Sequence, residues 1–336
     1  MSTPSSSGGA LTVGFDIGGT NTRAGVVNDR GEILARASDR TPETSEEMVR
    51  TIVSLIDELR SSFDISAVGV AVAGFLDRDC EIVRFAPHLP WRDDAPVRAI
   101  LEEATGLPVR LEHDANAAAW GEFRHGVAKD VDTWVFFALG TGIGATLMID
   151  GEIFRGSFGT APEFGHITVV PGGRACSCGK RGCLERYASG TALVDTAMEI
   201  ATRGGFENTK LYRRVVGKRA SGNDVMNAAR AGDALGVATI EEFATWLGQG
   251  LAMVSDILDP ELIVVGGGLS ADSDLYLNQA SEVMGKNIVG AGYRPLPRVI
   301  RAELGPEAGM IGVADLARED TRQRTRQRND QGETDA

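Results

Sequence analysis

Four potential metal ligands lie close together near the middle of the chain. His166, Cys176, Cys178 and Cys183 supply one imidazole and three thiols within eighteen positions. Cys80, the only other cysteine, lies far from this cluster in the sequence. Close thiols in a chain without a secretory signal favour a metal over disulfides, and a Cys₃His set leaves no open coordination position. We therefore predict a structural Zn²⁺ bound by these four residues.

Two carboxylates flank this cluster. Glu163 comes three residues before His166, and Glu185 comes two residues after Cys183. A loop stiffened by zinc would hold both side chains in fixed positions, and paired acceptors suit the vicinal hydroxyl groups of a sugar. Surface acids are more often simply solvated, so the two residues alone leave both interpretations open.

Two glycine-rich turns are the second chemical feature of the sequence. Gly18-Gly19-Thr20 and Gly140-Thr141-Gly142 each follow a short apolar run. Glycine allows backbone N–H groups to converge on an anion, and threonine adds a hydroxyl donor, so both turns suit phosphate groups. Hairpin turns are often rich in glycine for conformational reasons alone, but a matched pair favours phosphate binding. Neither turn has the spacing of a P-loop or of a Rossmann dinucleotide site.

An acid directly before the first turn has no counterpart before the second. Asp16 lies inside the apolar segment 13–17, whereas the equivalent position before the second turn is Ala138. Because carboxylates hold Mg²⁺ through its water ligands beside a nucleotide, Asp16 is a candidate for that role. The alternative is a turn in which its carboxylate accepts a hydrogen bond from the following backbone.

Asp114 lies where a strand is expected to end and a helix to begin, within segment 112–120. Phosphoryl transfer to an alcohol needs a carboxylate that accepts the hydroxyl proton, which contributes roughly 10²–10⁴-fold to the rate. An aspartate at this position can also cap the N-terminus of the helix. The two roles are compatible, because a cap also fixes the position of the carboxylate.

The hydrophobic pattern predicts strands and helices that would position these residues. Strands are expected at 11–15, 23–27, 33–37, 67–73, 109–112, 134–139, 145–149 and 262–265. Helices are expected at 45–59, 95–104, 115–123, 190–203, 222–230, 233–258, 274–284 and 308–317. The order of elements repeats: segment 15–20 corresponds to segment 137–142, and the apolar run 67–74 corresponds to 262–268. A duplicated α/β unit with a cleft between its copies is the architecture that this repetition predicts.

Composition narrows the class of protein. The 336 residues, 43% of them hydrophobic, correspond to about two domains. The balance of 34 basic against 47 acidic residues gives a net charge of −13, which argues against non-specific nucleic-acid binding and against anionic membranes. No stretch approaches the ~18 apolar residues of a membrane span, and the N-terminus lacks the features of a secretory signal. We therefore expect a cytoplasmic protein with neither nucleic-acid nor membrane partners.

Both ends of the chain, residues 1–10 and 319–336, are expected to be disordered. The first segment is rich in serine and glycine, and the second alternates arginines with polar residues, at Arg322, Arg324, Arg326 and Arg328. A solvated tail is the simpler interpretation of the arginines. Nucleic-acid binding by this tail has no support from nearby aromatic residues.

These motifs together resemble the ROK family of repressors, uncharacterised proteins and sugar kinases. The similarity runs from about residue 11 to residue 317 and is strongest to bacterial, actinobacterial-type ATP-dependent glucokinases. It is carried by segments 16–20, 114–119, 139–144, 163–166 and 176–185. The last of these, Cys-Ser-Cys-Gly-Lys-Arg-Gly-Cys-Leu-Glu, is similar to the zinc signature of the family and is highly specific.

The resemblance implies an α/β protein with the actin-like ATPase (ribonuclease H-like) fold and an active-site cleft between two α/β domains. The small domain would comprise residues 11–113 and 306–318, and the large domain residues 114–305, with a zinc loop at 163–185. The implied reaction transfers the γ-phosphate of ATP to the 6-hydroxyl of glucose, giving glucose 6-phosphate and ADP. The implied cofactors are ATP, Mg²⁺ and a structural Zn²⁺, and the implied assembly is a homodimer or homotetramer.

The resemblance also implies roles for individual residues, with Asp114 as the catalytic base. Sugar contacts are implied for Gly74, His113, Asn116, Glu163, His166 and Glu185, of which His166 also binds zinc. Nucleotide and magnesium contacts are implied for Asp16, Gly18, Gly19, Thr20, Gly140, Thr141, Gly142, Gly266, Gly267 and Gly268. His113 and His88 stand where relatives usually have asparagine, which places bulkier, titratable groups near the expected sugar pocket.

Three other functions are compatible with parts of this pattern. A kinase for another hexose, such as fructose, mannose or N-acetylmannosamine, would share every motif. A polyphosphate-dependent glucokinase would need a basic track to the cleft, which the acidic balance does not favour. A transcriptional repressor of the family would carry a helix-turn-helix before the kinase-like body, and only about ten residues precede Leu11, too few for that module.

Overall fold

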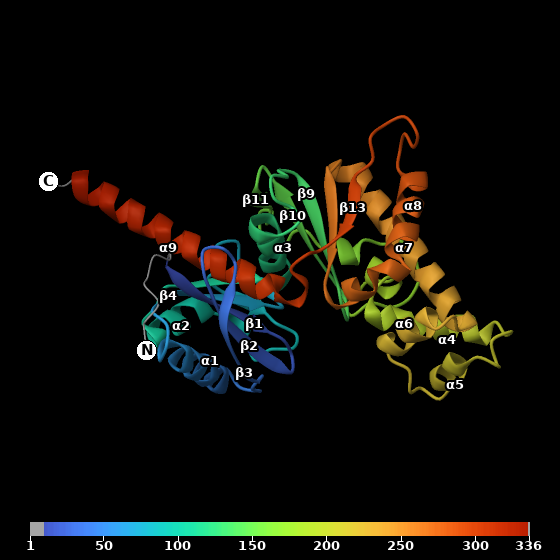
Figure 1. Ribbon diagram of the computed structural model, residues 1–336, viewed down its shortest axis with the longest axis horizontal. Helices are drawn as coiled ribbons and strands as arrows, with labels where there is room; N and C mark the ends of the chain where they lie inside the picture. Colours follow the sequence, from blue (N-terminus) through green and yellow to red (C-terminus); the bar gives the residue numbers. More distant parts are fainter. Residues whose placement is uncertain (1–9, 335–336) are drawn as a thin grey trace, which may run out of the picture. The chain divides into compact units, whose positions relative to one another are not determined.

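The computed structural model describes residues 10–334, with side chains as far as residue 326. The chain forms two compact units, each built from separate segments (Figure 1). Unit 1 comprises Met1–Asp130, Ile153–Ala161 and Pro306–Ala336, and unit 2 comprises Val131–Glu152 and Pro162–Gly305. The predicted disorder at residues 1–10 lies outside the described residues, apart from Ala10.

Unit 1 is built on a five-stranded sheet with the order β3-β2-β1-β4-β8. Its strands are β1 (Leu11–Ile17), β2 (Asn21–Val27), β3 (Ile33–Arg40), β4 (Ile65–Val72) and β8 (Val109–His113). β2 runs antiparallel to both β1 and β3, whereas β1, β4 and β8 are parallel. The helices of the unit are α1 (Ser45–Arg60), α2 (Val97–Thr105), α3 (Asp114–His125) and α9 (Ala308–Thr334).

Different helices cover the two faces of this sheet. Val13 and Phe15 of β1 lie in a hydrophobic core that includes the buried faces of α1 and α2. Because successive residues of a strand face opposite sides, Gly14 faces α9, where a Cβ atom would lie 2.0 Å from the Met310 carbonyl oxygen. Cover on both faces explains why β1 and β4 have nearly continuous apolar sequences.

Unit 2 repeats the sheet of unit 1 strand for strand, with the order β11-β10-β9-β12-β13. Its strands are β9 (Trp134–Leu139), β10 (Ile143–Ile149), β11 (Glu152–Ile153), β12 (Leu262–Gly266) and β13 (Arg298–Arg301). β9 is antiparallel to β10 and parallel to β12, which in turn is parallel to β13. The predicted correspondence of segment 15–20 with segment 137–142 is therefore confirmed, since each segment joins the central strand of its sheet to an antiparallel neighbour.

Five helices contribute to the hydrophobic core of this unit. They are α4 (Gly190–Thr202), α5 (Lys210–Val216), α6 (Gly222–Arg230), α7 (Ala234–Leu258) and α8 (Leu277–Asn287). The helix predicted at 274–284 lies at 277–287 in the structure, because residues 268–275 form a separate 3₁₀ segment before α8 begins. The sequence pattern did not indicate α5 or β13, which are too short to show a clear period.

A small three-stranded antiparallel sheet in unit 1 was also not predicted. It consists of β5 (Phe75–Leu76), β6 (Val83–Phe85) and β7 (Arg92–Ala95). Strands of two to four residues contain too few positions to show alternation. The sheet directly follows Gly74, where a Cβ atom would lie 2.8 Å from the Phe85 carbonyl oxygen.

Helix α3 belongs to unit 1, which corrects the domain boundary predicted between residues 113 and 114. α3 and α9 are packed backbone to backbone: a Cβ atom on Gly312 would lie 1.8 Å from the Ala117 carbonyl oxygen. A Cβ atom on Gly121 would lie 2.5 Å from the Ala308 carbonyl oxygen. The segment Ile153–Ala161 also belongs to unit 1, so the units are of nearly equal length rather than small and large.

We expect Gly312→Ala to destabilise unit 1, because the new methyl group would meet the backbone of α3 rather than a movable side chain. Overpacking of this kind costs about 1–3 kcal/mol. Gly309→Ala is the matched control on the same helix: its Cβ would lie 3.9 Å from the nearest atom, so better helix propensity should stabilise by up to about 1 kcal/mol. Urea unfolding measures both variants, and equal free energies of unfolding would contradict the close packing.

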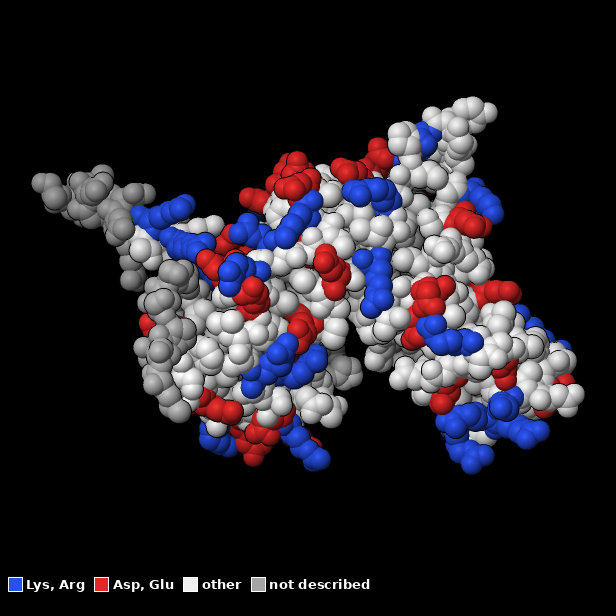
Figure 2. Space-filling view, in the orientation of Figure 1, with Lys and Arg blue, Asp and Glu red and all other residues white. Residues whose placement is uncertain are grey.

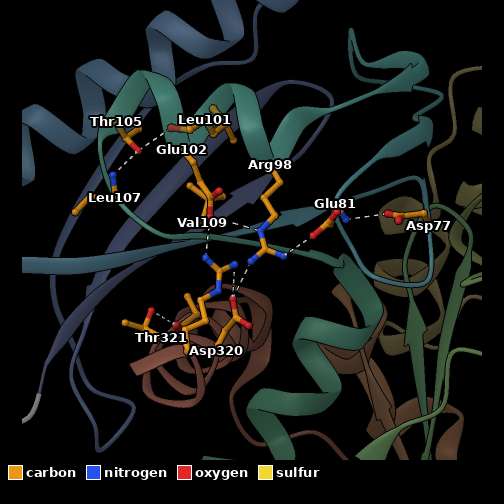
Figure 3. Close-up of polar contacts among 12 residues, drawn as sticks. Asp77, Glu81, Arg98, Leu101, Glu102, Thr105, Leu107, Val109, Asp320 and Thr321 are labelled. Carbon is orange, nitrogen blue, oxygen red and sulfur yellow. Dashed lines mark hydrogen bonds and ion pairs between the residues drawn. The ribbon is translucent and has the colours of Figure 1, made fainter. Parts of the chain in front are cut away.

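Helix α9 continues to Thr334, which corrects the disordered tail predicted at 319–336; residues 335–336 lie outside the described residues. Figure 3 shows the charged side chains between α9 and α2. Arg98 lies 3.2 Å from Asp320, and Arg324 lies 3.2 Å from Glu102. Through these ion pairs, polar residues of the tail have fixed partners on α2. The sequence pattern could not indicate these partners.

Charged residues of both signs are spread over the surface in Figure 2, and basic side chains gather over α5. The exposed basic residues in and after this helix are Lys210, Arg213, Arg214, Lys218 and Arg219. Among the residues that the structure describes, no helix is long and apolar enough to cross a membrane.

Candidate active site

The predicted site residues of unit 1 lie at the carboxyl ends of its three parallel strands. In the strand register Ile17 pairs with Val72, and Val72 pairs with His113. This edge of a parallel sheet is where α/β proteins usually bind ligands. The register brings together the glycine turn after β1, the Gly74 segment after β4 and Asp114 after β8.

Asp114 is the first residue of α3. Its carboxylate accepts a hydrogen bond of 2.8 Å from the Ala115 backbone N–H, and its Oδ1 lies 3.4 Å from His113 Nε2. The position before the helix is taken by His113 in an extended conformation. The capping role considered for Asp114 is therefore wrong, although the positive end of the helix dipole still favours its negative charge. The side chain is 47% exposed, so a substrate hydroxyl can reach it.

Asp16 lies one residue before the end of β1, directly opposite Arg23 on β2. The two side chains form an ion pair. Burial raises the pKa of Asp16, Arg23 opposes that rise, and the negative charge of Asp114 adds to it. A divalent cation near these carboxylates would therefore be stabilised by both charges, which fits the predicted magnesium role.

The turn Gly18-Gly19-Thr20 that joins β1 to β2 is exposed. It is closed by the Gly18 N–H, which donates to the Asn21 carbonyl oxygen at 3.0 Å. The Thr41 hydroxyl donates to the Gly18 carbonyl oxygen at 2.6 Å. The turn is thus fixed from within unit 1, and a pre-formed turn binds an anion without first being ordered.

Unit 2 places its glycine turn against the start of a helix. The turn Gly140-Thr141-Gly142 joins β9 to β10, and the Gly140 carbonyl oxygen accepts the Gly190 N–H at 2.8 Å. Gly190 is the first residue of α4, whose cap is Ser189. A helix N-terminus beside a glycine turn is a favourable place for a phosphate.

The glycines that follow β12 lie beside the same turn. Gly267 has φ 79°, and a Cβ atom there would lie 2.5 Å from the Leu139 carbonyl oxygen. Only glycine fits this conformation and this close approach. The structure therefore brings Gly266 and Gly267 next to the end of β9, and Gly268 follows them in the chain.

The four predicted zinc ligands converge in unit 2. Their ligand atoms all lie within 4.8 Å of one another. His166 Nδ1 lies 3.6 Å from Cys176 Sγ, and Cys178 Sγ lies 3.6 Å from Cys183 Sγ. A tetrahedral zinc with Zn–S bonds of about 2.3 Å separates its sulfur ligands by about 3.8 Å. The donor set and its spacing therefore fit Zn²⁺.

The backbone of the zinc loop is held by short-range pairing. Thr168 forms an isolated bridge with Cys183, and Ala175 forms one with Arg181. Gly182 has φ 77°, and a Cβ atom there would lie 1.7 Å from the Val170 carbonyl oxygen. A side chain at residue 182 would therefore open the loop at the position next to a ligand.

Glu163 lies near one proposed zinc ligand, and Glu185 is hydrogen-bonded to the backbone that follows the second glycine turn. His166 directs Nδ1 towards the thiols, while its Nε2 lies 3.9 Å from Glu163 Oε2. Glu185 Oε2 accepts the Ile143 N–H at 2.9 Å, and a Cβ atom on Gly142 would lie 2.2 Å from that oxygen. The zinc loop thus places Glu185 against the second glycine turn.

A buried carboxylate for which the sequence predicted no role lies beside Asp114. Glu112, 1% exposed, is the penultimate residue of β8. Its Oε1 accepts hydrogen bonds from Asn116 Nδ2 at 3.0 Å and from the His113 N–H at 3.1 Å. Its Oε2 pairs with Arg110 and Arg155, and the Cys80 thiol also contacts it. The sequence signal for this cluster was an acid inside the predicted strand 109–112.

The charge of Glu112 should make the protein sensitive to acid. Burial acts to raise the pKa of Glu112, but Arg155, Arg110 and the Asn116 amide outweigh it and hold the pKa at about 2. A lowered pKa stabilises the folded state above the unfolded-state value and loses that stabilisation as the pH falls towards 2. By linkage the loss is about 2 kcal/mol at about pH 3. Urea unfolding at pH 7 and pH 3 tests this: Glu112→Gln should lose less stability than the wild type, and equal losses would contradict it.

Two sheets of identical order, each with a glycine turn after its central strand, define the actin-like ATPase fold. Comparison with known families gives the class within this fold. The model of the ROK family matches residues 12–320. The chain belongs to the ROK family.

Individual relatives agree with this assignment. The glucokinase of Streptomyces coelicolor is 42% identical over 311 residues, which cover 92% of this chain and 98% of the relative. A solved ROK family glucokinase from Streptomyces griseus, in complex with glucose and AMPPNP, has a TM-score of 0.81 at 40% identity and covers 92% of this chain and 100% of its own. The ROK hexokinase of Thermus thermophilus has a TM-score of 0.78 at 32% identity, with 93% and 99% covered.

Proposed function

We propose that this protein is a glucokinase that transfers the γ-phosphate of ATP to the 6-hydroxyl of glucose. The observation that carries the proposal is Asp114: a partly exposed carboxylate at the start of α3, on the strand edge that also holds Asp16 and a glycine turn. The similar glucokinases of two Streptomyces species support the choice of sugar and phosphate donor. The products are glucose 6-phosphate and ADP.

Asp114 acts as the general base. Its carboxylate accepts the proton of the 6-hydroxyl while that oxygen forms a bond to the γ-phosphorus, and the bond from phosphorus to the leaving ADP oxygen breaks in line. Exposure of the side chain admits the hydroxyl, and its position at the start of α3 fixes where the proton is accepted. A correctly placed base contributes roughly 10²–10⁴-fold.

The two glycine turns bind the phosphates in this proposal. Gly18, Gly19 and Thr20 offer backbone donors in unit 1, and Gly140, Thr141 and Gly142 offer them beside the start of α4. Asp16 would hold the Mg²⁺ that accompanies ATP, and that ion neutralises the charge of the phosphates. The glycines 266–268 would line the adenosine site.

Candidate sugar ligands lie in each unit. Gly74, His113 and Asn116 are the proposed contacts of unit 1. Glu163, His166 and Glu185 are the proposed contacts of unit 2, and the zinc site supports them by fixing the loop on which they lie. Carboxylates accept pairs of sugar hydroxyls and would orient the ring with its 6-hydroxyl towards the base.

Specificity depends on the two histidines that replace the usual asparagines. His113 lies against Asp114, and the Cβ atom of His88 would lie 3.4 Å from a Cβ atom on Gly19. Both rings are larger than the side-chain amide of asparagine. A coupled assay of glucose, fructose, mannose and N-acetylmannosamine, each with ATP and with polyphosphate, tests the proposal. Glucose with ATP should give the highest kcat/KM. A higher value for another pair would make that sugar and that phosphate donor the substrates in place of glucose and ATP.

The assembly and the location stay predictions. The family resemblance implies a homodimer or homotetramer, which sedimentation equilibrium of the purified chain measures. The cytoplasmic location is a prediction from the sequence, and fractionation of cells tests it.

A further inference from the structure

Helix α3 begins without a capping side chain, although it carries the proposed base in its first turn. His113 occupies the capping position and makes no side-chain hydrogen bond to the helix. The first N–H groups of a helix have no partners within it, and an uncapped end tends to fray. The Ala115 N–H donates to Asp114 itself, so the base depends on a group outside the first turn to fix the start of α3.

We propose that Glu112 and Arg155 are positioning residues for Asp114 and Asn116, an inference that rests on the proposed kinase function. Glu112 Oε1 accepts hydrogen bonds from the His113 backbone N–H at 3.1 Å and from Asn116 Nδ2 at 3.0 Å. One oxygen therefore fixes the backbone just before Asp114 and a side chain just after it. Its buried position protects both hydrogen bonds from water.

The carboxylate can do this only while its charge is compensated. An ionised group that is buried this fully needs opposite charges and hydrogen bonds close to it. Arg110, on the same strand, lies 3.1 Å from Glu112 Oε2, and Arg155 pairs with the same oxygen. Arg155 is itself 21% exposed and lies 43 residues away in the sequence.

Arg155 also belongs to a short segment of unit 1 that interrupts the chain of unit 2. The chain passes from unit 2 into unit 1 at Ile153 and returns at Pro162, one residue before Glu163. Gly159 of this segment packs closely on unit 1, since a Cβ atom there would lie 2.7 Å from the Arg78 backbone nitrogen. The ion pair of Arg155 with Glu112 thus anchors the segment that precedes one proposed sugar ligand to the strand that precedes the base.

Arg155→Met tests this role, because methionine keeps much of the volume and removes the charge. A hydrogen bond to a charged group is worth enough to change a rate or an affinity by about 10- to 100-fold. We expect kcat/KM for glucose to fall by about that factor, with KM for glucose raised and KM for ATP changed by less than about twofold. Arg155→Lys keeps the charge and should recover most of the loss.

Arg98→Met is the matched control. Arg98 lies in the same unit, is 12% exposed and pairs with Glu81, Glu102 and Asp320 (Figure 3). Its loss should lower the melting temperature and leave KM for glucose unchanged. If both methionine variants lower the melting temperature and neither changes KM for glucose, the Glu112–Arg155 pair is only a structural ion pair and the proposal is wrong.

Hydrogen–deuterium exchange separates this proposal from the proposed function. Peptides that cover residues 109–120 should exchange at least about tenfold faster in Arg155→Met than in the wild type, and at the wild-type rate in Arg98→Met. Unchanged exchange in Arg155→Met would overturn the positioning role even if the enzyme is a glucokinase. If the wild type phosphorylates no sugar, the kinase proposal fails while faster exchange still supports the anchoring of α3. If Arg155→Met does not fold, Glu112→Gln replaces it in both measurements.

Discussion

Asp114→Asn is expected to lower kcat for glucose phosphorylation by roughly 10²–10⁴-fold, the contribution of a well-placed general base. Asparagine keeps the shape of the side chain but cannot accept the hydroxyl proton. KM for ATP and the zinc content should stay at wild-type values, because Asp114 lies in unit 1 at the start of α3 and the zinc ligands lie in unit 2. Steady-state kinetics with glucose and ATP measure the change.

Glu46→Gln provides the matched control for this substitution. Glu46 is an exposed acid in the first turn of α1, also in unit 1. Its replacement removes one charge at a helix N-terminus and should leave kcat unchanged. An Asp114→Asn enzyme with more than about a tenth of the wild-type kcat would show that another group accepts the proton.

Cys183→Ser is expected to have the second largest effect. Cys183 is fully buried, and the next residue, Leu184, lies in the core of unit 2. Serine is a poor zinc ligand, so the metal should be lost and the loop with Glu163 and Glu185 should become mobile. We expect the zinc content to fall from about one ion per chain to near zero, and kcat/KM for glucose to fall by at least about 100-fold.

Zinc content by mass spectrometry and the melting temperature check this prediction together with kinetics. Cys80→Ala is the control, since Cys80 is equally buried and lies in unit 1. That variant should retain its zinc. A wild-type protein that is fully active after purification without zinc would contradict a structural role for the metal.

The features that were predicted from sequence depend on residues close together in the chain. The proposed zinc ligands fall within segment 166–183, so their types and spacing alone indicated a metal site. The two strand–turn–strand units were visible because glycines interrupt continuous apolar runs at 18–19 and at 140–142. Asp114 became a candidate because a strand pattern changes to a helix pattern at that residue.

The features that were missed depend on contacts between distant segments. The order of residues gives no signal for the pairing of Arg155 with Glu112, or for the fact that α3 packs on α9 rather than joining unit 2. The tail after residue 318 has the composition of a disordered segment, and its helix is supported by ion pairs to α2. Tertiary contacts of this kind override local propensity.

The most direct test of the account is a crystal structure of the wild-type enzyme with glucose and AMPPNP, in which the distance from Asp114 to the sugar O6 is measured. We predict one carboxylate oxygen within about 2.6–3.2 Å of O6, the range of a hydrogen bond that transfers a proton. A glucose molecule whose O6 lies beyond hydrogen-bond reach of Asp114, with a different side chain in its place, would contradict the assignment of the base.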